Sequence, residues 1–293
     1  MMTLDEFYQQ VLKYGIQRDP RRDKPRIKSF SDSGILFGDR KVQVRKIMVG
    51  IDIEVPELLL AERVRERRGL DLVVAHHPEG RPFALLHCVM NLHVDVLKNA
   101  GVPEDTARQL MDERILDISR RLLSANHTRA VDAARILKMP FLCMHTPADN
   151  HVYSRIQALM NRRKPRRVQE IIGLLMEFEE YREAARIGTE PRVIFGNPRA
   201  HAGKILVDMT GGTEGHTGVF DKLYKAGIRT VICMHLSEEH FRKVRDTALN
   251  VIIAGHISSD NLGMNLLLDR IEKHARREFE IVEASGFKRV RRN

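Results

Sequence analysis

The sequence predicts an α/β protein of two lobes, in which mainly parallel sheets are flanked by helices. Short runs rich in Val, Ile and Leu alternate with longer helical patterns along much of the 293-residue chain. Such runs are typical of buried parallel strands. The alternation occurs twice, over residues 46–75 and again over residues 192–283. A hydrophobic content of 43% is sufficient for a substantial core, so two facing lobes are the architecture we expect.

The first lobe begins with a strand–helix–strand unit. Residues 46–53 and 70–75 predict strands, and residues 57–68 predict the amphipathic helix between them. Pro56 and the acids beside it are typical of a helix entrance, because proline fits the first turn and carboxylates favour its positive end. Three helices and a strand follow, at residues 85–99, 104–123, 129–137 and 139–144.

The second lobe follows a charged helical stretch, residues 152–186, which is interrupted at Lys164-Pro165. Its predicted strands lie at residues 192–195, 204–209, 230–234, 251–254 and 278–283, and its predicted helices at residues 219–226, 238–248 and 262–275. The predicted domains are a first lobe at residues 1–151 with a helical insertion near residues 85–137, a helical linker at 152–190, and a second lobe at 191–293.

The chain is strongly basic, with a formal net charge of +10 at pH 7. Lys and Arg gather at residues 18–28, 63–68, 162–167 and 288–292. These clusters would form a nucleic-acid footprint if they met on one face. However, aromatic residues make up only 5% of the chain and are not interleaved with the clusters, which argues against base stacking. We favour a solvated surface and a basic tail.

Composition also bears on location. No apolar run approaches the roughly 20 residues needed to span a bilayer, and residues 1–14 lack the apolar segment of a secretory signal. Three cysteines, Cys88, Cys143 and Cys233, are widely spaced and form no Cys-x-x-Cys pair. Buried, inert thiols in a cytoplasmic protein are the simplest interpretation.

Four of the predicted strands end at histidines. These histidines are His76, His77, His145, His235 and His256. Ligands of open α/β sheets bind just beyond the carboxyl ends of such strands. Two of the histidines have an aspartate four residues later, Asp149 after His145 and Asp260 after His256. The pattern predicts a metal site assembled from distant parts of the chain.

Each of these residues has a simpler alternative. His76 and His77 precede Pro78 and could be two loop histidines at the surface. Asp149 and Asp260 could cap the helices that follow them, since aspartate accepts hydrogen bonds from free N–H groups there. Imidazole and carboxylate groups are nonetheless the preferred ligands of Zn, Mn, Fe and Co, and their recurrence at strand ends favours the metal site.

A glycine-rich segment, residues 208–218, lies between a predicted strand and a predicted helix. Gly211 and Gly212 could let its backbone N–H groups cradle a phosphate, but a tight turn without a ligand is an equal alternative. The segment has neither the lysine of a P-loop nor a Gly-x-Gly-x-x-Gly pattern. The chain has no Gly-x-Ser-x-Gly motif and no Cys–His nucleophile motif, so a hydrolytic nucleophile would be water activated by a metal.

Three motifs occur in a fixed order: Asp71-Leu72-Val73-Val74-Ala75-His76-His77-Pro78, His145-Thr146-x-x-Asp149 and Gly255-His256-x-x-Ser259-Asp260. Together they resemble the three signatures of the NGG-interacting-factor-like family, often labelled GTP cyclohydrolase I type 2. The Gly211-Gly212 loop and residues 235–240 fall where that family has a glycine-rich loop and a histidine-containing segment. With gaps, the resemblance extends from about residue 29 to residue 271. It implies a two-lobed α/β fold, a dinuclear metal site between the lobes, and a toroidal homohexamer.

The resemblance also implies which residues bind the two divalent ions, which would be Zn, Mn, Fe or Co. The implied ligands are His76, His77, Asp149, His256 and Asp260. The chain departs from the family pattern where Asp260 replaces the usual bridging glutamate, and where 72 positions separate His77 from Asp149. That separation is about twice what the family leads us to expect. A third departure is Met234-His235-Leu236, where the family has Thr-Gly-Glu or Thr-Gly-Asp.

The leading interpretation is a dinuclear metal-binding protein that acts as a metal-dependent hydrolase on a nucleotide or another phosphorylated small molecule. His145, Glu238 and Glu239 are the candidates for proton transfer. One alternative is a non-catalytic metal-handling or regulatory protein that uses the same ligands to store or deliver metal. Another is a nucleic-acid-associated ring whose basic residues line a central opening.

Overall fold

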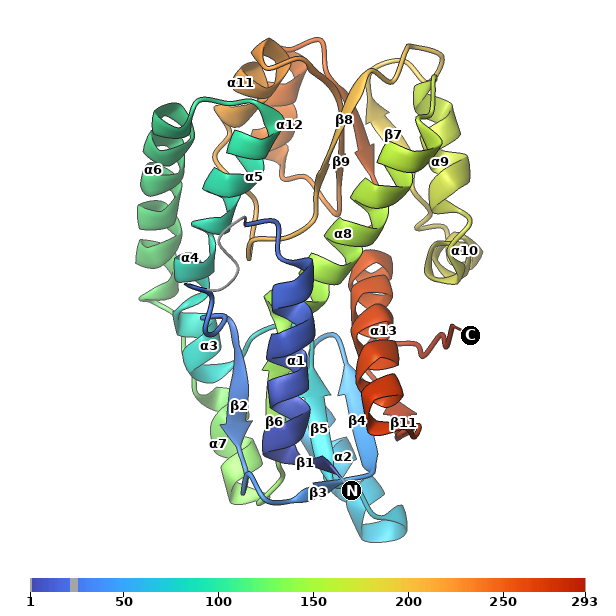
Figure 1. Ribbon diagram of the computed structural model, residues 1–293. Helices are drawn as coiled ribbons and strands as arrows, with labels where there is room; N and C mark the ends of the chain where they lie inside the picture. The colour runs from blue at the N-terminus through green and yellow to red at the C-terminus, as the bar shows by residue number, and fades with distance from the viewer. Residues whose placement is uncertain (1, 22–25, 293) are drawn as a thin grey trace.

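The computed structural model describes residues 2–21 and 26–292, whose strands form two main sheets that long helices connect (Figure 1). In spatial order, the first sheet contains β11 (Glu280–Glu283), β4 (Lys46–Gly50), β5 (Leu72–Ala75), β6 (Phe141–Met144) and β2 (Ser33–Phe37). The second sheet contains β7 (Arg192–Phe195), β10 (Asn250–Ile253), β9 (Ile228–Cys233) and β8 (Lys204–Asp208). A small ladder pairs β1 (Met2–Thr3) with β3 (Gln43–Val44). Both main sheets are parallel except at one edge, where β2 runs antiparallel to β6 and β7 runs antiparallel to β10.

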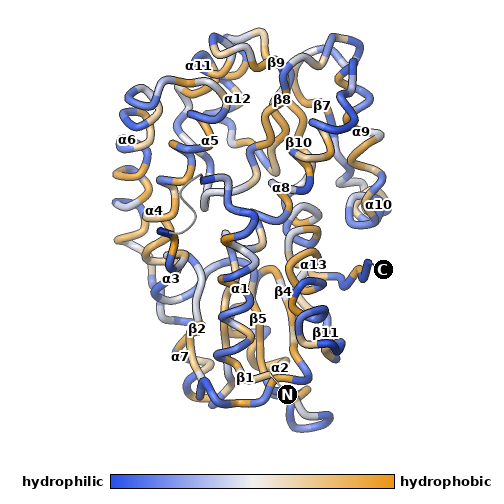
Figure 2. Tube along the Cα trace, in the orientation of Figure 1, coloured by the Kyte–Doolittle hydropathy of each residue, from blue (hydrophilic) through white to orange (hydrophobic). Residues whose placement is uncertain are grey.

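Helices cover both faces of the first sheet. One face carries α1 (Leu4–Arg18), α8 (His145–Arg163) and α13 (His256–Ala275), and the other carries α2 (Val55–Arg68) and α7 (Arg129–Ile136). Every residue of β5 and β6 is buried, as expected of parallel strands that are covered on both sides. Figure 2 shows central strands of both sheets, such as β5 and β10, largely in hydrophobic colours, with helices of mixed colour around them.

The second sheet is covered in the same way. On one face lie α5 (Leu92–Ala100), α6 (Glu104–Leu122), α11 (Val219–Lys225) and α12 (Glu238–Arg245), and on the other lie the later turns of α8 with α9 (Val168–Leu175) and α10 (Glu179–Arg186). Two short helices, α3 (Gly80–Ala84) and α4 (Leu86–Val89), precede α5 along the chain.

The helices α8 and α13 hold the two sheets together. In α8, Ala148 belongs to the core of the first sheet, whereas Val152 and Ile156 belong to the core of the second. The two helices pack closely where they cross, since a Cβ atom at Gly263 of α13 would lie 2.5 Å from the carbonyl oxygen of Ala148. Because both helices contribute to both cores, they fix the cleft between the sheets.

The structure confirms the predicted α/β class with mainly parallel sheets flanked by helices. The predicted helix at residues 104–123 is α6, and the predicted break at Lys164-Pro165 separates α8 from α9. The sequence analysis omitted α1 and β2. A readable signal for α1 was present, because Thr3 and Glu6 form a capping box in which each side chain accepts a hydrogen bond from the other residue's N–H group.

The two cores are assembled differently from the predicted lobes in three places. Helices α5 and α6 of the expected insertion pack against the second sheet. Helices α9 and α10 of the expected linker bury their apolar sides in the core on the opposite face of that sheet. Strand β11, expected in the second lobe, pairs with β4 of the first sheet. An amphipathic helix must cover an apolar surface, and spacing along the chain does not reveal which sheet offers one. The domain boundaries themselves stay predictions.

The basic segment at residues 288–292 is folded against the protein. The Arg289 guanidinium donates to Asp269 at 2.6 Å and to Glu272 at 2.7 Å, and Arg292 pairs with the buried carboxylate of Glu180. Part of the expected basic tail therefore neutralises buried acids. The cluster expected at residues 18–28 includes residues 22–25, which lie outside the described residues.

None of the helices in the described part of the chain is both long enough and apolar enough to cross a bilayer.

Candidate functional site

The predicted site residues lie at the carboxyl ends of strands from both sheets. His76 and His77 follow β5, helix α8 follows its neighbour β6, and helix α13 follows β10 of the second sheet. These ends face the space between the sheets, as the rule for ligand sites in parallel sheets predicts.

The first turns of α8 and α13 are organised alike. His145 is the first residue of α8 and Asp149 lies one turn later, while His256 begins α13 and Asp260 lies one turn later. A spacing of four residues places each aspartate on the same helix face as its histidine. Both aspartates are inside their helices, so the alternative in which they cap the helix ends is wrong.

Asp260 lies at the centre of the group. Its Oδ1 atom is 3.4 Å from His76 Nε2, and its Oδ2 atom is 3.5 Å from both His77 Nε2 and His256 Nε2. Asp149 Oδ1 lies 3.4 Å from His76 Nε2 on the other side. The structure thus brings together all five side chains that the sequence analysis proposed as ligands.

Several polar atoms of this group have no hydrogen-bond partner among the described residues. They are Nδ1 and Nε2 of His76, Oδ1 of Asp149, and both carboxylate oxygens of Asp260, in side chains at most 6% exposed. A buried polar atom without a partner costs about 1–3 kcal/mol. A cation bound among these atoms would remove that cost, so the residues present fit metal ions.

Three overlapping sets of side chains offer ligand atoms within 4.8 Å of one another: His76, His77 and His145; His77, His256 and Asp260; and His76, Asp149 and Asp260. We call these six residues the candidate metal cluster. Its imidazole and carboxylate groups match the ligands of Zn, Mn, Fe and Co.

His145 belongs to the cluster by position. Its ring centroid lies 5.0 Å from that of His76, and its Nε2 atom lies 3.7 Å from Asp149 Oδ2. On its other side, the buried Asp32 carboxylate is 2.8 Å from His145 Nδ1 and accepts a hydrogen bond from Thr146 Oγ1 at 2.6 Å. A carboxylate behind a histidine fixes the orientation of the ring, which directs Nε2 of His145 into the cluster.

Asp52 supports His77 in the same way, with its Oδ1 atom 2.6 Å from His77 Nδ1. The sequence analysis named neither Asp52 nor Asp32. Asp52 lies two residues beyond the end of β4, and the strand-end argument did not identify it because the predicted strand, residues 46–53, extended past it. Asp32 comes just before the antiparallel strand β2, which was not predicted. The rule that ligands follow the ends of parallel strands therefore could not identify it.

Burial and the charges within the candidate metal cluster shift the pKa values of its members in opposite directions. Burial lowers the pKa of His76 to about 4 and raises the pKa of Asp149 to about 7. Burial would also lower the pKa of His77, but contacts with Asp260 and Asp52 outweigh it and raise that pKa to about 10. Burial would raise the pKa of the Asp260 carboxyl, yet His76 and His77 hold it well below its usual range. A metal ion at this site competes with protons for the imidazole nitrogens of its ligands.

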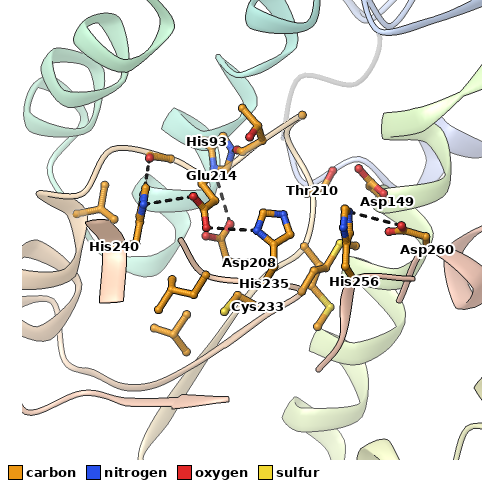
Figure 3. Close-up of a pocket in the computed structure, with 18 of the residues that line it drawn as sticks. His93, Asp149, Asp208, Thr210, Glu214, Cys233, His235, His240, His256 and Asp260 are labelled. Atoms are coloured by element: carbon orange, nitrogen blue, oxygen red, sulfur yellow. Dashed lines mark hydrogen bonds and ion pairs between the residues drawn. The ribbon is translucent and has the colours of Figure 1, made fainter. Parts of the chain in front are cut away.

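A second polar group, the loop wall, faces the cluster across the cleft (Figure 3). We define the loop wall as His93, Asp208, Glu214, His235 and His240. Figure 3 shows Asp149, His256 and Asp260 on one side of the close-up and the loop wall on the other, with His235 as the loop-wall residue nearest His256. The ring centroids of His235 and His256 are 4.7 Å apart.

Glu214 organises the loop wall. Its Oε1 atom accepts a hydrogen bond from the Ser237 N–H group at 2.6 Å and lies 3.3 Å from His235 Nδ1, while its Oε2 atom lies 3.3 Å from His240 Nδ1. His240 Nε2 donates to the Gly215 carbonyl at 2.8 Å. Burial would raise the pKa of Glu214, but the histidines and the Ser237 N–H group outweigh it and lower the pKa to about 2.

The cleft between the two groups has a volume of about 70 Å³, enough for several water molecules or for the end group of a small ligand. Among its described lining residues are acids, histidines and apolar side chains but neither Lys nor Arg. The basic residues that give the chain its charge of +10 lie elsewhere.

The remaining predicted site residues have different positions. Glu238 and Glu239 are exposed at the start of α12, and neither is among the described residues that line the cleft. Gly211 and Gly212 have φ angles of +102° and +91°, and a Cβ atom on Gly211 would meet the His93 ring at 2.8 Å. The loop therefore needs glycine for its conformation and its close packing, and phosphate binding by it stays a prediction.

Comparison with solved structures identifies proteins of the same architecture. A NIF3 superfamily protein from Sphaerobacter thermophilus is 30% identical, covers 95% of this chain and 98% of its own, and superposes with a TM-score of 0.79. The reduced form of HcgD from Methanocaldococcus jannaschii is 14% identical over 96% of this chain and 97% of its own, with a TM-score of 0.56. A Bacillus cereus protein related to NIF3 is 10% identical over 97% of this chain and 96% of its own, with a TM-score of 0.54. No protein-family model matches the chain, and comparison with curated proteins gives no match.

Proposed function

The chain belongs to the NIF3 (NGG-interacting-factor-like) superfamily, and from that premise we propose that it is a dinuclear metal protein that acts as a metal-dependent hydrolase. Its substrate would be a nucleotide or another phosphorylated small molecule. The observation that carries the proposal is the set of buried, unpartnered ligand atoms on His76, Asp149 and Asp260.

The overlapping sets of ligand atoms support two ions that share one carboxylate. His76, Asp149 and Asp260 would hold one ion, and His77, His256 and Asp260 would hold the other. Asp260 is a member of both sets, so it would help to hold both ions although it is one methylene shorter than glutamate. When bound, such ions supply Lewis acidity and an activated water.

The side chains around the ligands support this chemistry. The contact with Asp32 leaves His145 Nε2 facing Asp149, where it can bind an ion or accept a proton from a nearby water. Asp52 orients His77 from behind in the same manner. Because the described lining contains neither Lys nor Arg, the phosphate of a phosphorylated substrate would have to lie against the ions.

The proposal is tested by turnover in a defined metal. Protein stripped with a chelator would be reloaded with Zn, Mn, Fe(II) or Co and assayed against nucleotides and phosphomonoesters. We expect hydrolysis that disappears with chelator, returns with metal and is lost in His77→Ala, but persists in the exposed variant Asp246→Asn. Tight metal binding without turnover of any of these compounds would contradict hydrolysis and favour a protein that stores or delivers metal.

We also propose a homo-oligomer, with a hexamer as the expected form. Each main sheet has open edges, at β11 and β2 in the first and at β7 and β8 in the second, and open edges invite pairing. Light scattering is expected to give a multiple of the 33.7 kDa chain mass. A mass near one chain over a wide concentration range would contradict the proposal.

A further inference from the structure

Asp208, at the end of β8, presents a carboxylate to the cleft without a close partner. Its side chain is 34% exposed, and its one ion-pair contact among the described residues is with His93 Nδ1, 3.7 Å away. That distance is too long for a hydrogen bond. Asp208 therefore retains acceptor capacity on the wall opposite the candidate metal cluster.

The surroundings of His93 explain why it does not satisfy Asp208. His93 Nε2 lies 2.9 Å from the Thr213 carbonyl oxygen, which can only accept. This contact holds the ring with its Nδ1 atom 3.7 Å from the Asp208 carboxylate, beyond hydrogen-bond distance. A Cβ atom at Gly211 would lie 2.8 Å from the His93 ring, so the ring also packs closely against this loop.

The rest of the loop wall differs from Asp208. Glu214 already accepts a hydrogen bond from Ser237 and contacts two histidines. None of the described lining residues is Lys or Arg, so the only positive charge that these side chains can offer Asp208 is that of a protonated histidine. A donor for this carboxylate must come from a bound molecule or from water.

We propose that Asp208 binds a nitrogen donor of the substrate, an ammonium or an N–H group, while the other end of the same molecule lies at the candidate metal cluster. This inference rests on the proposed metal site, because the second anchor is the set of buried, unpartnered atoms of Asp149 and Asp260. The two anchors line one cleft. The substrate class is thus a bipolar small molecule, with an oxygen-rich end and a nitrogen-donor end.

Hydroxamates provide a direct test, because they chelate metal ions through one end and can carry different groups at the other. Three probes share one chain length: aminocaproic hydroxamate with an ammonium tail, caproic hydroxamate with a methyl tail, and adipic monohydroxamate with a carboxylate tail. Their dissociation constants would be measured by calorimetry on zinc-loaded protein. We expect the ammonium probe to bind about tenfold more tightly than the methyl probe, as for a hydrogen bond to a charged group, and the carboxylate probe to bind most weakly.

Variants separate the tail effect from the metal effect. Asp208→Asn should make the three probes nearly equal while zinc content and melting temperature stay as in the wild type. Asp208→Lys should reverse the order, so that the carboxylate probe binds most tightly. Asp246→Asn, the same substitution at an exposed site, should keep the wild-type order.

The possible failures can be told apart. If all three probes bind the wild type with equal affinity, or if Asp208→Asn keeps the wild-type order of affinities, Asp208 does not recognise the substrate. Either result leaves the proposed metal site uncontradicted. If no probe binds and zinc analysis finds no metal in the protein, the proposed function fails, and this inference fails with it.

Discussion

The two walls of the cleft are built from the same residue types, but their polar atoms are satisfied differently. In the candidate metal cluster, atoms of His76, Asp149 and Asp260 are buried without hydrogen-bond partners among the described residues. In the loop wall, Glu214 and His240 are bonded to a backbone N–H group and a carbonyl group close by. Some histidine and carboxylate atoms of the candidate metal cluster therefore have no protein partner, whereas most of those in the loop wall have one.

This difference separates ligands from structural side chains better than residue type does. Native proteins rarely leave buried polar atoms unpaired, so a cluster of such atoms indicates something that the protein binds. A histidine with both ring nitrogens in contact with protein groups, as in His240, indicates a fixed loop instead. We therefore expect substitutions in the candidate metal cluster to change metal binding, and substitutions in the loop wall to change stability or ligand choice at constant metal content.

The largest effect is expected at Asp32, which supports the candidate metal cluster from behind. Asp32→Ala removes the partner of His145 Nδ1 and of the Thr146 hydroxyl, both of which are buried. We expect a loss of about 1–3 kcal/mol in the free energy of unfolding and a fall of about 10- to 100-fold in metal affinity. Urea unfolding and zinc titration would measure the two effects. Unchanged metal affinity would mean that the orientation of His145 does not depend on Asp32.

Glu214→Gln should have a smaller effect, confined to stability. The folded pKa of about 2 lies below the ordinary value of 4.5, so the carboxylate stabilises the fold above pH 4.5, and this contribution is lost as the pH falls toward 2. With allowance for solvent screening, we expect the variant to be about 1–2 kcal/mol less stable at neutral pH.

The stability gap between Glu214→Gln and the wild type should narrow as the pH falls below 4.5. Unfolding curves across this range, with metal analysis at neutral pH, would test both statements. A lower metal content in Glu214→Gln than in the wild type would show that the loop wall also affects metal binding. This result would contradict the distinction between the two walls.

Glu238→Gln is expected to have the smallest effect. Glu238 is exposed, and its partner Arg242 lies one turn away on the same helix. Such pairs contribute about 0.3–0.5 kcal/mol, so melting temperature, metal content and turnover should all stay close to the wild type. A large loss of turnover at unchanged stability would place this residue in the reaction and require α12 to move toward the cleft.

Much of the fold and the site could be predicted from the sequence because both depend on local patterns. Apolar runs between helices predicted the strands, and histidines at their ends predicted the side chains that meet around Asp260. The four-residue spacings of His145 with Asp149 and of His256 with Asp260 lie within single helices, where geometry follows from sequence alone.

The features that were missed depend on contacts between distant segments. Asp32 contacts His145 across 113 positions, and β11 returns to the first sheet after the chain has completed the second. Whether a histidine is free or tied down also depends on distant partners, as with His93 and the Thr213 carbonyl, 120 positions apart. Sequence patterns within single segments do not predict such contacts.

The number of metal ions per folded chain tests the central claim most directly. Wild type, Asp260→Asn, Asp260→Glu and the loop-wall variant Asp208→Asn would be equilibrated with zinc and analysed alongside their melting temperatures. We expect two ions per chain in the wild type, Asp260→Glu and Asp208→Asn, and weaker, incomplete binding in Asp260→Asn, which loses the charge shared by both sets of ligands. Two ions held with unchanged affinity by a folded Asp260→Asn variant would contradict the account.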